Sequence, residues 1–315
     1  MKVLVTGANG LVGRATCMAL YRSGFVVRAA SRVMLPSMPE IESFSISSIH
    51  AQTHWESALA LVDAVVHCAA RVHVMHDADA DPLSAFRAVN CHGTLNLARQ
   101  AAAAGVKRFI FISSVKVNGE FTVPGQAFTE EDTPNPQDAY SQSKLEAEQG
   151  LREIAAETGM KLVVVRSPLV YGPGVKANFA ALMRAVQRGW PLPLGAIHNQ
   201  RSLVALDNLA DFIVTCITHA GAVDQTFLIS DGQDLSTTEL VRALAHVAGV
   251  SSHLLPVPMR GLAWAGRLLG KEDAVQRLIG NLQIDSSKAR NLLGWVPKVS
   301  VQEGLRRAML GNGSR

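Results

Sequence analysis

The chain has 315 residues, 48% of them hydrophobic, and it carries 30 Lys and Arg against 26 Asp and Glu. This length and composition favour a folded protein with one large domain or two unequal domains, and they argue against a disordered chain. The formal charge of +4 is spread without a dense basic run, so the sequence gives no support for nucleic acid as a partner.

Targeting, redox and metal signals are absent from the sequence. No apolar run reaches the length of a membrane span, and a strand pattern begins directly after Met1, so we expect neither a signal peptide nor a membrane partner. The cysteines lack the spacing of a disulfide framework or a metal site, and His198, His246 and His253 show no ligand spacing. We therefore expect buried thiols, a cytoplasmic protein and no metal. The four cysteines are Cys17, Cys68, Cys91 and Cys216.

The first element predicts a nucleotide site. Residues 2–6 read as a short buried strand, and the helical pattern 11–23 follows a glycine-rich turn. Glycines at these positions let the backbone turn tightly and approach a pyrophosphate, which the helix N-terminus would hold. Because the turn stands between a strand and a helix, it predicts a dinucleotide site. The residues expected there are Gly7, Asn9, Gly10, Leu11, Val12 and Gly13.

The second strand, at about 25–30, ends in Ser31 and Arg32. A site for NAD would show an Asp or Glu near this point, where it binds the ribose 2′-hydroxyl. A cation and a hydroxyl suit a 2′-phosphate better, so the sequence favours NADP(H), with NAD(H) as the alternative.

Strands at about 62–68, 107–113 and 161–166 alternate with helices at 83–104 and 138–158. This alternation of strands and helices predicts an α/β fold with a doubly wound parallel Rossmann sheet. Ala and Leu in the two helices fit simple core packing, or the interface of a homodimer.

The regular alternation of strands and helices ends after Pro168, where prolines and glycines separate shorter elements. We expect a nucleotide-binding domain over residues 1–168, to which the chain returns near 203–217, and a smaller substrate lobe over residues 169–315. Trp190, Trp264 and Trp295 are interpreted as core residues of this second part.

Tyr140 and Lys144 stand four residues apart in the helix expected at 138–158, and so they share one face. A phenol loses its proton near pH 10, and an adjacent cation favours the phenolate. The pair is therefore a candidate for moving a proton to or from a hydroxyl or carbonyl oxygen.

Taken together, Thr6-Gly7-x-x-Gly10-x-x-Gly13, Ser113-Ser114 and Tyr140-x-x-x-Lys144 resemble the extended short-chain dehydrogenase/reductase family. Members of this kind are nucleotide-sugar epimerases, dehydratases and ketoreductases. The resemblance implies that Ser114 hydrogen-bonds the reacting oxygen and that Tyr140 is the acid/base. It also implies that Lys144 holds the nicotinamide ribose and tunes Tyr140.

The same resemblance implies further contacts to the cofactor and the substrate. The family usually has an Asp beside the adenine, where this chain has Ser48 and Ile49. The other implied cofactor contacts are Ala69, Ala70, Arg71, Asn90, Pro168 and Val170. The residues implied for the diphosphate and uracil of a nucleotide sugar are Asn178, Phe179, Leu194 and Arg201, with Arg277 as a candidate second phosphate ligand.

The residues after Ser114 reduce the number of reaction types that the resemblance allows. Related 4,6-dehydratases carry an Asp-Glu pair there, whereas this chain has Val115 and Lys116, and a valine cannot transfer a proton. Lys116 is a candidate donor to a substrate oxygen or an acetamido carbonyl, and the alternative is a lysine that reaches solvent.

The sequence thus predicts an enzyme acting at C4 of a UDP-hexose. The favoured reading is an NADPH-consuming 4-ketoreductase for a 4-keto-6-deoxy-N-acetylhexosamine, because no acidic residue follows the second strand and the chain resembles reductases of bacterial surface polysaccharides. The first alternative is a 4-epimerase that retains NAD. An alternative of another class is a non-catalytic NAD(P)-sensing regulator, against which the complete set of Ser114, Tyr140 and Lys144 argues.

Overall fold

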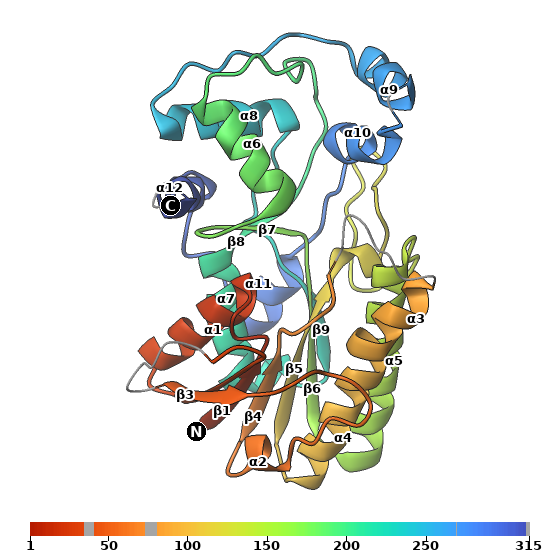
Figure 1. The fold of residues 1–315 in the computed structure, drawn as a ribbon, viewed down its shortest axis with the longest axis vertical. Coiled ribbons are helices and arrows are strands. Elements are labelled where there is room, and N and C mark those ends of the chain that lie inside the picture. Colours follow the sequence, from red (N-terminus) through yellow and green to blue (C-terminus); the bar gives the residue numbers. More distant parts are fainter. Residues whose placement is uncertain (35–40, 73–80, 269, 313–315) are drawn as a thin grey trace.

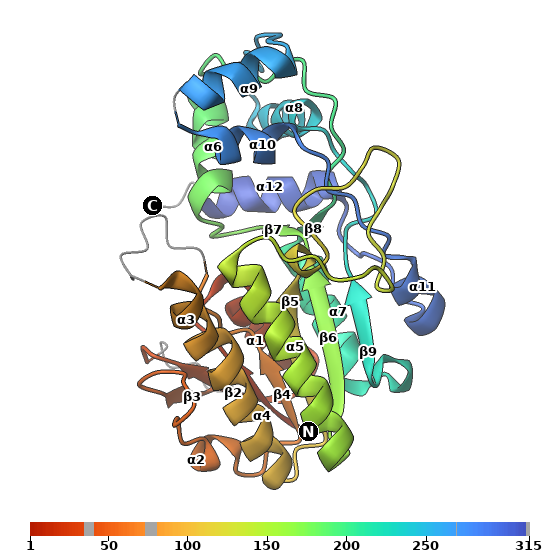
Figure 2. The same ribbon diagram turned by 90° about the vertical axis from the view of Figure 1, so that its right-hand side faces the viewer.

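The computed structural model describes residues 1–34, 41–72, 81–268 and 270–312. A parallel sheet wrapped by helices forms one end of the molecule, and a second group of helices stands above the carboxyl ends of its strands (Figure 1). The view from the side shows the same two tiers (Figure 2). The α/β fold with a doubly wound parallel sheet is therefore confirmed.

Within the described residues the central sheet has seven strands, all parallel, in the order β3-β2-β1-β4-β5-β6-β9. The order reverses between β1 and β4, and the loops that leave these two strands diverge at that point, which is where such sheets bind nucleotides. The strands are β1 (Lys2–Thr6), β2 (Val26–Ser31), β3 (Ile41–Ser45), β4 (Ala64–His67), β5 (Arg108–Ser114), β6 (Lys161–Ser167) and β9 (Gln225–Leu228).

Two of these strands, β3 and β9, were not expected from the sequence. Both lie at the margins of the sheet, where few apolar residues are needed: β3 reads Ile-Glu-Ser-Phe-Ser, and β9 has four residues. The inner strands are buried on both faces, and their continuous apolar runs made them easy to recognise.

Helices cover both faces of the sheet. On one face the packing against Val3 and Val5 includes Cys17 and Leu20 of one helix and Phe212 and Ile213 of another. These two helices are α1 (Leu11–Arg22) and α7 (Leu206–Thr218). The helices on the side of the opposite core cluster are α2 (Glu56–Leu59), α3 (Pro82–Arg87), α4 (Thr94–Ala103) and α5 (Ala139–Thr158).

The single helix expected at 83–104 is divided in the structure. A π-helical segment, η1 (Ala88–Gly93), stands between α3 and α4, and it carries the buried Asn90. The wider π turn moves Asn90 to a position from which its side chain reaches two other elements, as described below. Insertions of this kind are frequent at functional sites.

The second tier has its own apolar core, which includes Tyr171, Met183, Leu244 and Leu305. After the first elements of the second tier, the chain returns to the first tier, where it forms helix α7 and strand β9, and it then enters the second tier again. The remaining elements are η2 (Val115–Val117), β7 (Leu169–Tyr171), α6 (Ala177–Gln187), β8 (Leu203–Ala205), η3 (Ala220–Ala222), α8 (Thr237–Ala248), α9 (Met259–Leu268), α10 (Glu272–Ile279), α11 (Ser287–Leu293) and α12 (Val301–Asn312). The division into a nucleotide domain over 1–168 and a substrate lobe over 169–315 stays a prediction, as does the homodimer.

The tryptophans were predicted to lie in the core, and this is wrong for two of the three. Trp295 is buried against Phe212 and donates its indole N–H to Asp211 at 2.9 Å. Trp190 and Trp264 are 54% and 67% exposed. A large apolar ring is normally buried wherever a core can receive it, so two exposed indoles in one part of a protein need an explanation.

The described residues contain no helix long and apolar enough to cross a membrane, and no group of His, Cys, Asp and Glu side chains that could hold a metal ion. All four cysteines are free thiols.

Candidate active site

The glycine-rich turn after β1 is packed so closely that side chains would not fit. Gly7 has φ +65°, and a Cβ there would lie 2.8 Å from the Cα of Ala69. A Cβ on Gly13 would lie 2.2 Å from the carbonyl oxygen of Gly7, and the Gly10 N–H donates to that same oxygen at 2.8 Å. The turn, the start of α1 and the loop after β4 are therefore held in direct backbone contact.

Helix α1 begins at this turn without a side-chain cap. Its N-cap residue is Gly10, which has no side chain to accept from the first turn. The backbone N–H groups of that turn are therefore available to an anion. Asn9, Leu11 and Val12 flank that position. A cradle that any Cβ would fill, together with an uncapped helix N-terminus, fits the diphosphate of a dinucleotide.

The end of β2 does not offer both groups that the sequence suggested for a 2′-phosphate. Ser31 is 2% exposed and donates its hydroxyl to the carbonyl oxygen of Val33 at 2.5 Å, whereas Arg32 is exposed. The expectation of NADP(H) is weakened, because the hydroxyl of Ser31 is used within the chain. Near the predicted adenine region, Ser48 and Ile49 are half-buried, and Ile49 packs beside the backbone of Gly93.

Asn90 of η1 joins the loop after β4 to α5. Its Oδ1 accepts from the N–H of Arg71 at 2.7 Å, and its Nδ2 donates to the carbonyl of Arg71 and to the hydroxyl of Ser143, both at 3.0 Å. Asn90 is 1% exposed, so its amide is spent on positioning its neighbours. It thereby fixes the loop that holds Ala69 and Ala70, and contacts the turn of α5 between Tyr140 and Lys144. Contact of these residues with a cofactor stays a prediction.

A buried histidine that the sequence analysis passed over connects the same elements. His67 lies between the hydroxyls of Thr6 and Thr94, at 2.7 and 2.9 Å, and Thr94 donates to the carbonyl of Asn90 at 2.7 Å. Burial lowers the pKa of His67 to about 3, so the ring stays neutral. The chain of hydrogen bonds ties the ends of β1 and β4 to η1.

Tyr140 lies in the first turn of α5, where Asp138 and Ser141 form a capping box that fixes the start of the helix. Burial, with a smaller effect of Asp138, raises the pKa of the Tyr140 phenol to about 12. This is opposite to the direction expected from Lys144 alone. Burial therefore determines the direction of the Tyr140 pKa shift, and the Lys144 ammonium packs against an aromatic ring instead.

That ring belongs to Phe111 in β5. The Nζ of Lys144 lies 4.0 Å from the ring centroid, and Lys144 is 1% exposed. Burial lowers the pKa of the ammonium to about 7, and the carboxylate of Glu148 opposes this shift. Lys144 is thus a buried lysine close to its neutral form, which is unusual outside functional sites.

A buried ion pair underlies the site, and sequence analysis missed it. Arg166 of β6 donates to both carboxylate oxygens of Glu148, at 3.0 and 2.6 Å, and the Ser113 hydroxyl donates to the same carboxylate at 2.5 Å. Glu148 follows Lys144 by four residues on α5, and this spacing was the available signal. Ser113 precedes Ser114, and Arg166 precedes Pro168 by two residues.

Ser114 ends β5 and keeps its hydroxyl proton available. Its Oγ accepts from the backbone N–H of Lys116 at 3.2 Å, and the residue is half-buried. An oxygen that accepts from the backbone can donate its own hydrogen to a ligand. Ser114 therefore fits the role of a donor to a reacting oxygen.

Two of the predicted substrate residues, Lys116 and Arg201, are cations that already have partners within the protein. The ammonium of Lys116 pairs with Glu120 and with Asp138, the latter at 2.6 Å, so a substrate contact by Lys116 competes with two carboxylates. Arg201 donates to the carbonyl of Gly280 at 3.0 Å. Burial lowers the pKa of Arg201, the Glu120 carboxylate opposes this shift, and the charge of Arg277 adds to it.

The positive charge of Arg277 is close enough to Arg201 to lower its pKa, although less than burial does. Phe179 and Leu194, by contrast, are buried in the core of the second tier, with Phe179 stacked on Tyr171. Asn178 is exposed at the start of α6, and Val170 of β7 is half-buried. The substrate roles of all these residues stay predictions.

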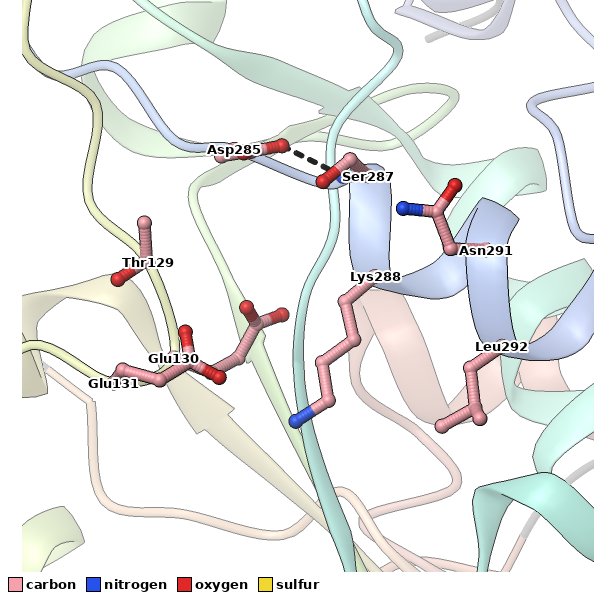
Figure 3. A pocket seen from close by; sticks show the side chains of 8 residues that line it. All are labelled: Thr129, Glu130, Glu131, Asp285, Ser287, Lys288, Asn291 and Leu292. Carbon is pink, nitrogen blue, oxygen red and sulfur yellow. Dashed lines mark hydrogen bonds between the residues drawn. The ribbon is translucent and has the colours of Figure 1, made fainter.

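A pocket of about 410 Å³ lies elsewhere, beside β9 and α11 (Figure 3). Figure 3 shows Glu130, Glu131 and Lys288 around the same hollow. Glu130 accepts from the N–H of Leu228 at 2.7 Å and so closes the margin of the sheet. The residues that line the pocket include none of the predicted site residues; they are Thr129, Glu130, Glu131, Asp285, Ser287, Lys288, Asn291 and Leu292.

A comparison with protein families gives the same assignment as these motifs. The model described as the NAD dependent epimerase/dehydratase family matches residues 3–230, which is more than half of the chain. The chain belongs to this family. It is an enzyme of the extended short-chain dehydrogenase/reductase type, as its sequence indicated.

Individual relatives agree in fold. A Vibrio cholerae protein named UDP-glucose 4-epimerase is 48% identical over 306 residues, which cover 96% of this chain and 93% of that protein. The Thermotoga maritima UDP-glucose 4-epimerase structure with UDP-glucose has TM-score 0.78 at 24% identity, covering 99% of this chain and 98% of that one. The Thermus thermophilus UDP-glucose 4-epimerase complex with NAD has TM-score 0.79 at 22% identity, covering 100% and 99%.

The packing of the glycine turn gives a first prediction. Gly13→Ala places a methyl group against the Gly7 carbonyl, so we expect a loss of about 1–3 kcal/mol in the free energy of unfolding and weaker nicotinamide binding. Gly261→Ala is the matched control, because a Cβ there meets its nearest atom at 3.6 Å on an exposed helix; its stability should be equal or slightly higher. Urea unfolding and cofactor titration measure both. Equal stability of the two variants would contradict the packing argument.

Lys144 gives a prediction about pH. Between pH 7 and pH 10.5 the unfolded chain keeps a proton that the folded, cofactor-free chain has lost, so Lys144 makes the free energy of unfolding rise with pH in that window. We expect Lys144→Met to be more stable than the parent at pH 7, with a difference that shrinks as the pH approaches 10.5. Urea unfolding across this range is the measurement, with the exposed Lys107→Met as control. A pH-independent difference, or a less stable variant, would show that the ammonium is well accommodated.

Proposed function

We propose that the protein is a UDP-hexose 4-epimerase that retains NAD. The observation that carries this proposal is the 48% identity to the Vibrio cholerae UDP-glucose 4-epimerase over 96% of the chain. It replaces the ketoreductase that the sequence favoured. That preference rested on Ser31 and Arg32 and on the resemblance to reductases of bacterial surface polysaccharides, and the Ser31 hydroxyl donates to the Val33 carbonyl within the chain.

The chain has the groups that proton transfer at C4 requires. When bound, the nicotinamide ring supplies reversible hydride acceptance at C4 of the sugar. Ser114 donates a hydrogen bond to the C4 oxygen, and the Tyr140 phenol exchanges the proton of that oxygen. The high pKa of free Tyr140 suits an acid that must hold its proton until a ligand and the cofactor's charge are present.

Lys144 contributes a donor that moves little. Its Nζ lies over the Phe111 ring, and the Glu148 ion pair fixes the next turn of α5, so the ammonium is held for the hydroxyls of the nicotinamide ribose. Inversion of the configuration at C4 of the sugar adds one requirement. Because hydride acceptor and acid/base are fixed, the oxidised sugar must present its other face to the same groups before C4 is reduced again.

Arg201 and Arg277 fit the diphosphate of the substrate. Burial disfavours the charge of Arg201, the Glu120 carboxylate offsets part of this cost, and the positive charge of Arg277 adds to it. An anion with several oxygens lowers the remaining cost, and arginine offers the forked donors that phosphate accepts. The diphosphate would anchor the nucleotide end and leave the hexose free to reorient.

Removal of the phenolic oxygen tests the acid/base. Tyr140→Phe keeps the ring beside Phe86 but cannot exchange a proton, so we expect turnover to fall by about two to four orders of magnitude with the fold retained. Steady-state epimerisation with cofactor occupancy measured in parallel is the readout. Unchanged turnover at full occupancy would remove Tyr140 from the mechanism.

The decisive experiment separates epimerase from reductase. Offered UDP-glucose or UDP-N-acetylglucosamine without added nicotinamide, the purified enzyme should form the 4-epimer, because each hydride is returned to the sugar it came from. The Tyr140→Phe protein is the control for background conversion.

Other outcomes identify the alternatives. Absence of a 4-epimer, with one NADPH consumed per molecule of UDP-4-keto-6-deoxy-N-acetylglucosamine, would establish the ketoreductase. Cofactor binding without turnover of any UDP-sugar would establish the regulator.

A further inference from the structure

The end of the molecule farthest from the sheet carries the two exposed tryptophans. Trp264 and Leu268 lie one turn apart on α9, and both are about two-thirds exposed, at 67% and 65%. Figure 1 shows α9 at this end, opposite α2. The other two tryptophans of the chain, Trp55 and Trp295, are buried.

A second pair of segments brings another exposed tryptophan to this end of the molecule. The backbone of Leu192 exchanges hydrogen bonds with His253 and Leu255, both at 2.8 Å, which places Trp190 beside the segment that leads into α9. Trp190 and Leu255 are exposed. We name the set Trp190, Leu255, Trp264 and Leu268 the apical patch.

The two sequence stretches that carry the apical patch have charge of one sign. Residues 169–206 and 240–271 contain eight Lys and Arg and no Asp or Glu. The whole chain, by comparison, has 30 basic against 26 acidic residues, so the remainder is acidic on balance. Acidic residues resume at Glu272, which pairs with Arg267 at 3.1 Å.

Most of these cations are not needed for a nucleotide sugar. Arg201 is the member that the proposed diphosphate site uses, whereas Arg188, Arg260 and Lys271 are exposed. Arg188 lies over the ring of Trp190, with its guanidinium carbon 5.4 Å from the centroid. Arg260, Trp264 and Leu268 follow one another at intervals of four residues and so share one face of α9.

The opposite face of α9 is engaged within the protein. Gly266 is buried, and a Cβ there would lie 2.7 Å from a methyl group of Val275 in α10. Leu262 packs on the core of the second tier. The outer face is thus held in place by the fold and presents indole, leucine and guanidinium groups to solvent.

We propose that the apical patch and its cations form a surface that docks on an anionic lipid membrane. Indole rings partition to the boundary between headgroups and acyl chains, where their apolar body and N–H are both accommodated. Arginine and lysine around them are attracted to anionic headgroups. The enzyme then binds peripherally, with α9 in the plane of the interface and the sheet pointing away. This departs from the expectation that the protein has no membrane partner.

The charge pattern favours lipid over a second copy of the chain. Two copies that met through this surface would bring like charges together, which is unfavourable. A lipid surface offers negative charge and an apolar layer at once, and it matches both features of the patch. The proposal is independent of the reaction, because none of the residues involved belongs to the proposed catalytic or substrate site.

The test uses the intact enzyme and vesicles of phosphatidylcholine alone, or with about a third of the lipid replaced by phosphatidylglycerol. We expect cosedimentation with the anionic vesicles only, and loss of binding when salt rises from about 0.1 to 1 M. Tryptophan emission should shift to the blue on binding, because Trp190 and Trp264 leave water while Trp55 and Trp295 are buried throughout.

Three variants assign the binding to the patch. The double change Trp264→Ser and Leu268→Ser should weaken binding by about tenfold or more. Arg260→Gln with Lys271→Gln should weaken it by about fivefold per cation. Leu61→Ser is the matched control: Leu61 is 89% exposed and follows α2 at the other end of the molecule, so binding should be unchanged. Enzyme turnover in solution and urea unfolding verify that each variant is folded.

Several outcomes would overturn the proposal. One is the absence of vesicle binding by the parent enzyme, and another is equal binding to neutral and anionic vesicles. Binding that the patch variants do not alter would place the contact elsewhere. A dimer in analytical ultracentrifugation that the double change dissociates, without vesicle binding, would make the patch an interface between copies.

Discussion

The ion pair of Glu148 and Arg166 holds together the three elements on which the proposed reacting groups stand. Glu148 belongs to α5 with Tyr140 and Lys144, and Arg166 lies in β6 just before Pro168. Ser113, bound to the same carboxylate, brings in the end of β5. Burying two charges is costly, and only a complete set of partners offsets that cost, so the arrangement tolerates little displacement. The burial of Lys144 beside this ion pair is part of the same arrangement.

Those features of the site that depend on short stretches of chain could be predicted from the sequence. Gly10 and Gly13 are required by contacts within one strand-turn-helix unit, and Gly7 by its φ of +65°, so their spacing carries the information. Tyr140 and Lys144 share a helix face by the helical period alone. The inner strands of the sheet were recognisable for a similar reason, since burial on both faces demands continuous apolar runs.

The remainder depends on partners distant in the sequence, which no local pattern records. The use of Asn90 as a clamp on Arg71 and the raised pKa of Tyr140 both arise from neighbours brought in by folding. Trp190 and Trp264 illustrate the same limit from the other side: composition alone assigns an indole to the core, and only the arrangement of the second tier shows that no core encloses them.

The two margins of the sheet end in carboxylates. At one, Glu130 occupies the N–H of Leu228 in β9; at the other, Glu42 of β3 forms ion pairs with Lys2 and Arg28 across the neighbouring strands. An open strand edge is a template for a strand from another molecule, and charge placed there makes such addition unfavourable. Glu130 therefore removes one donor that an added strand would need at the β9 edge, whereas Glu42 ties the edge strand β3 to the strands inside it.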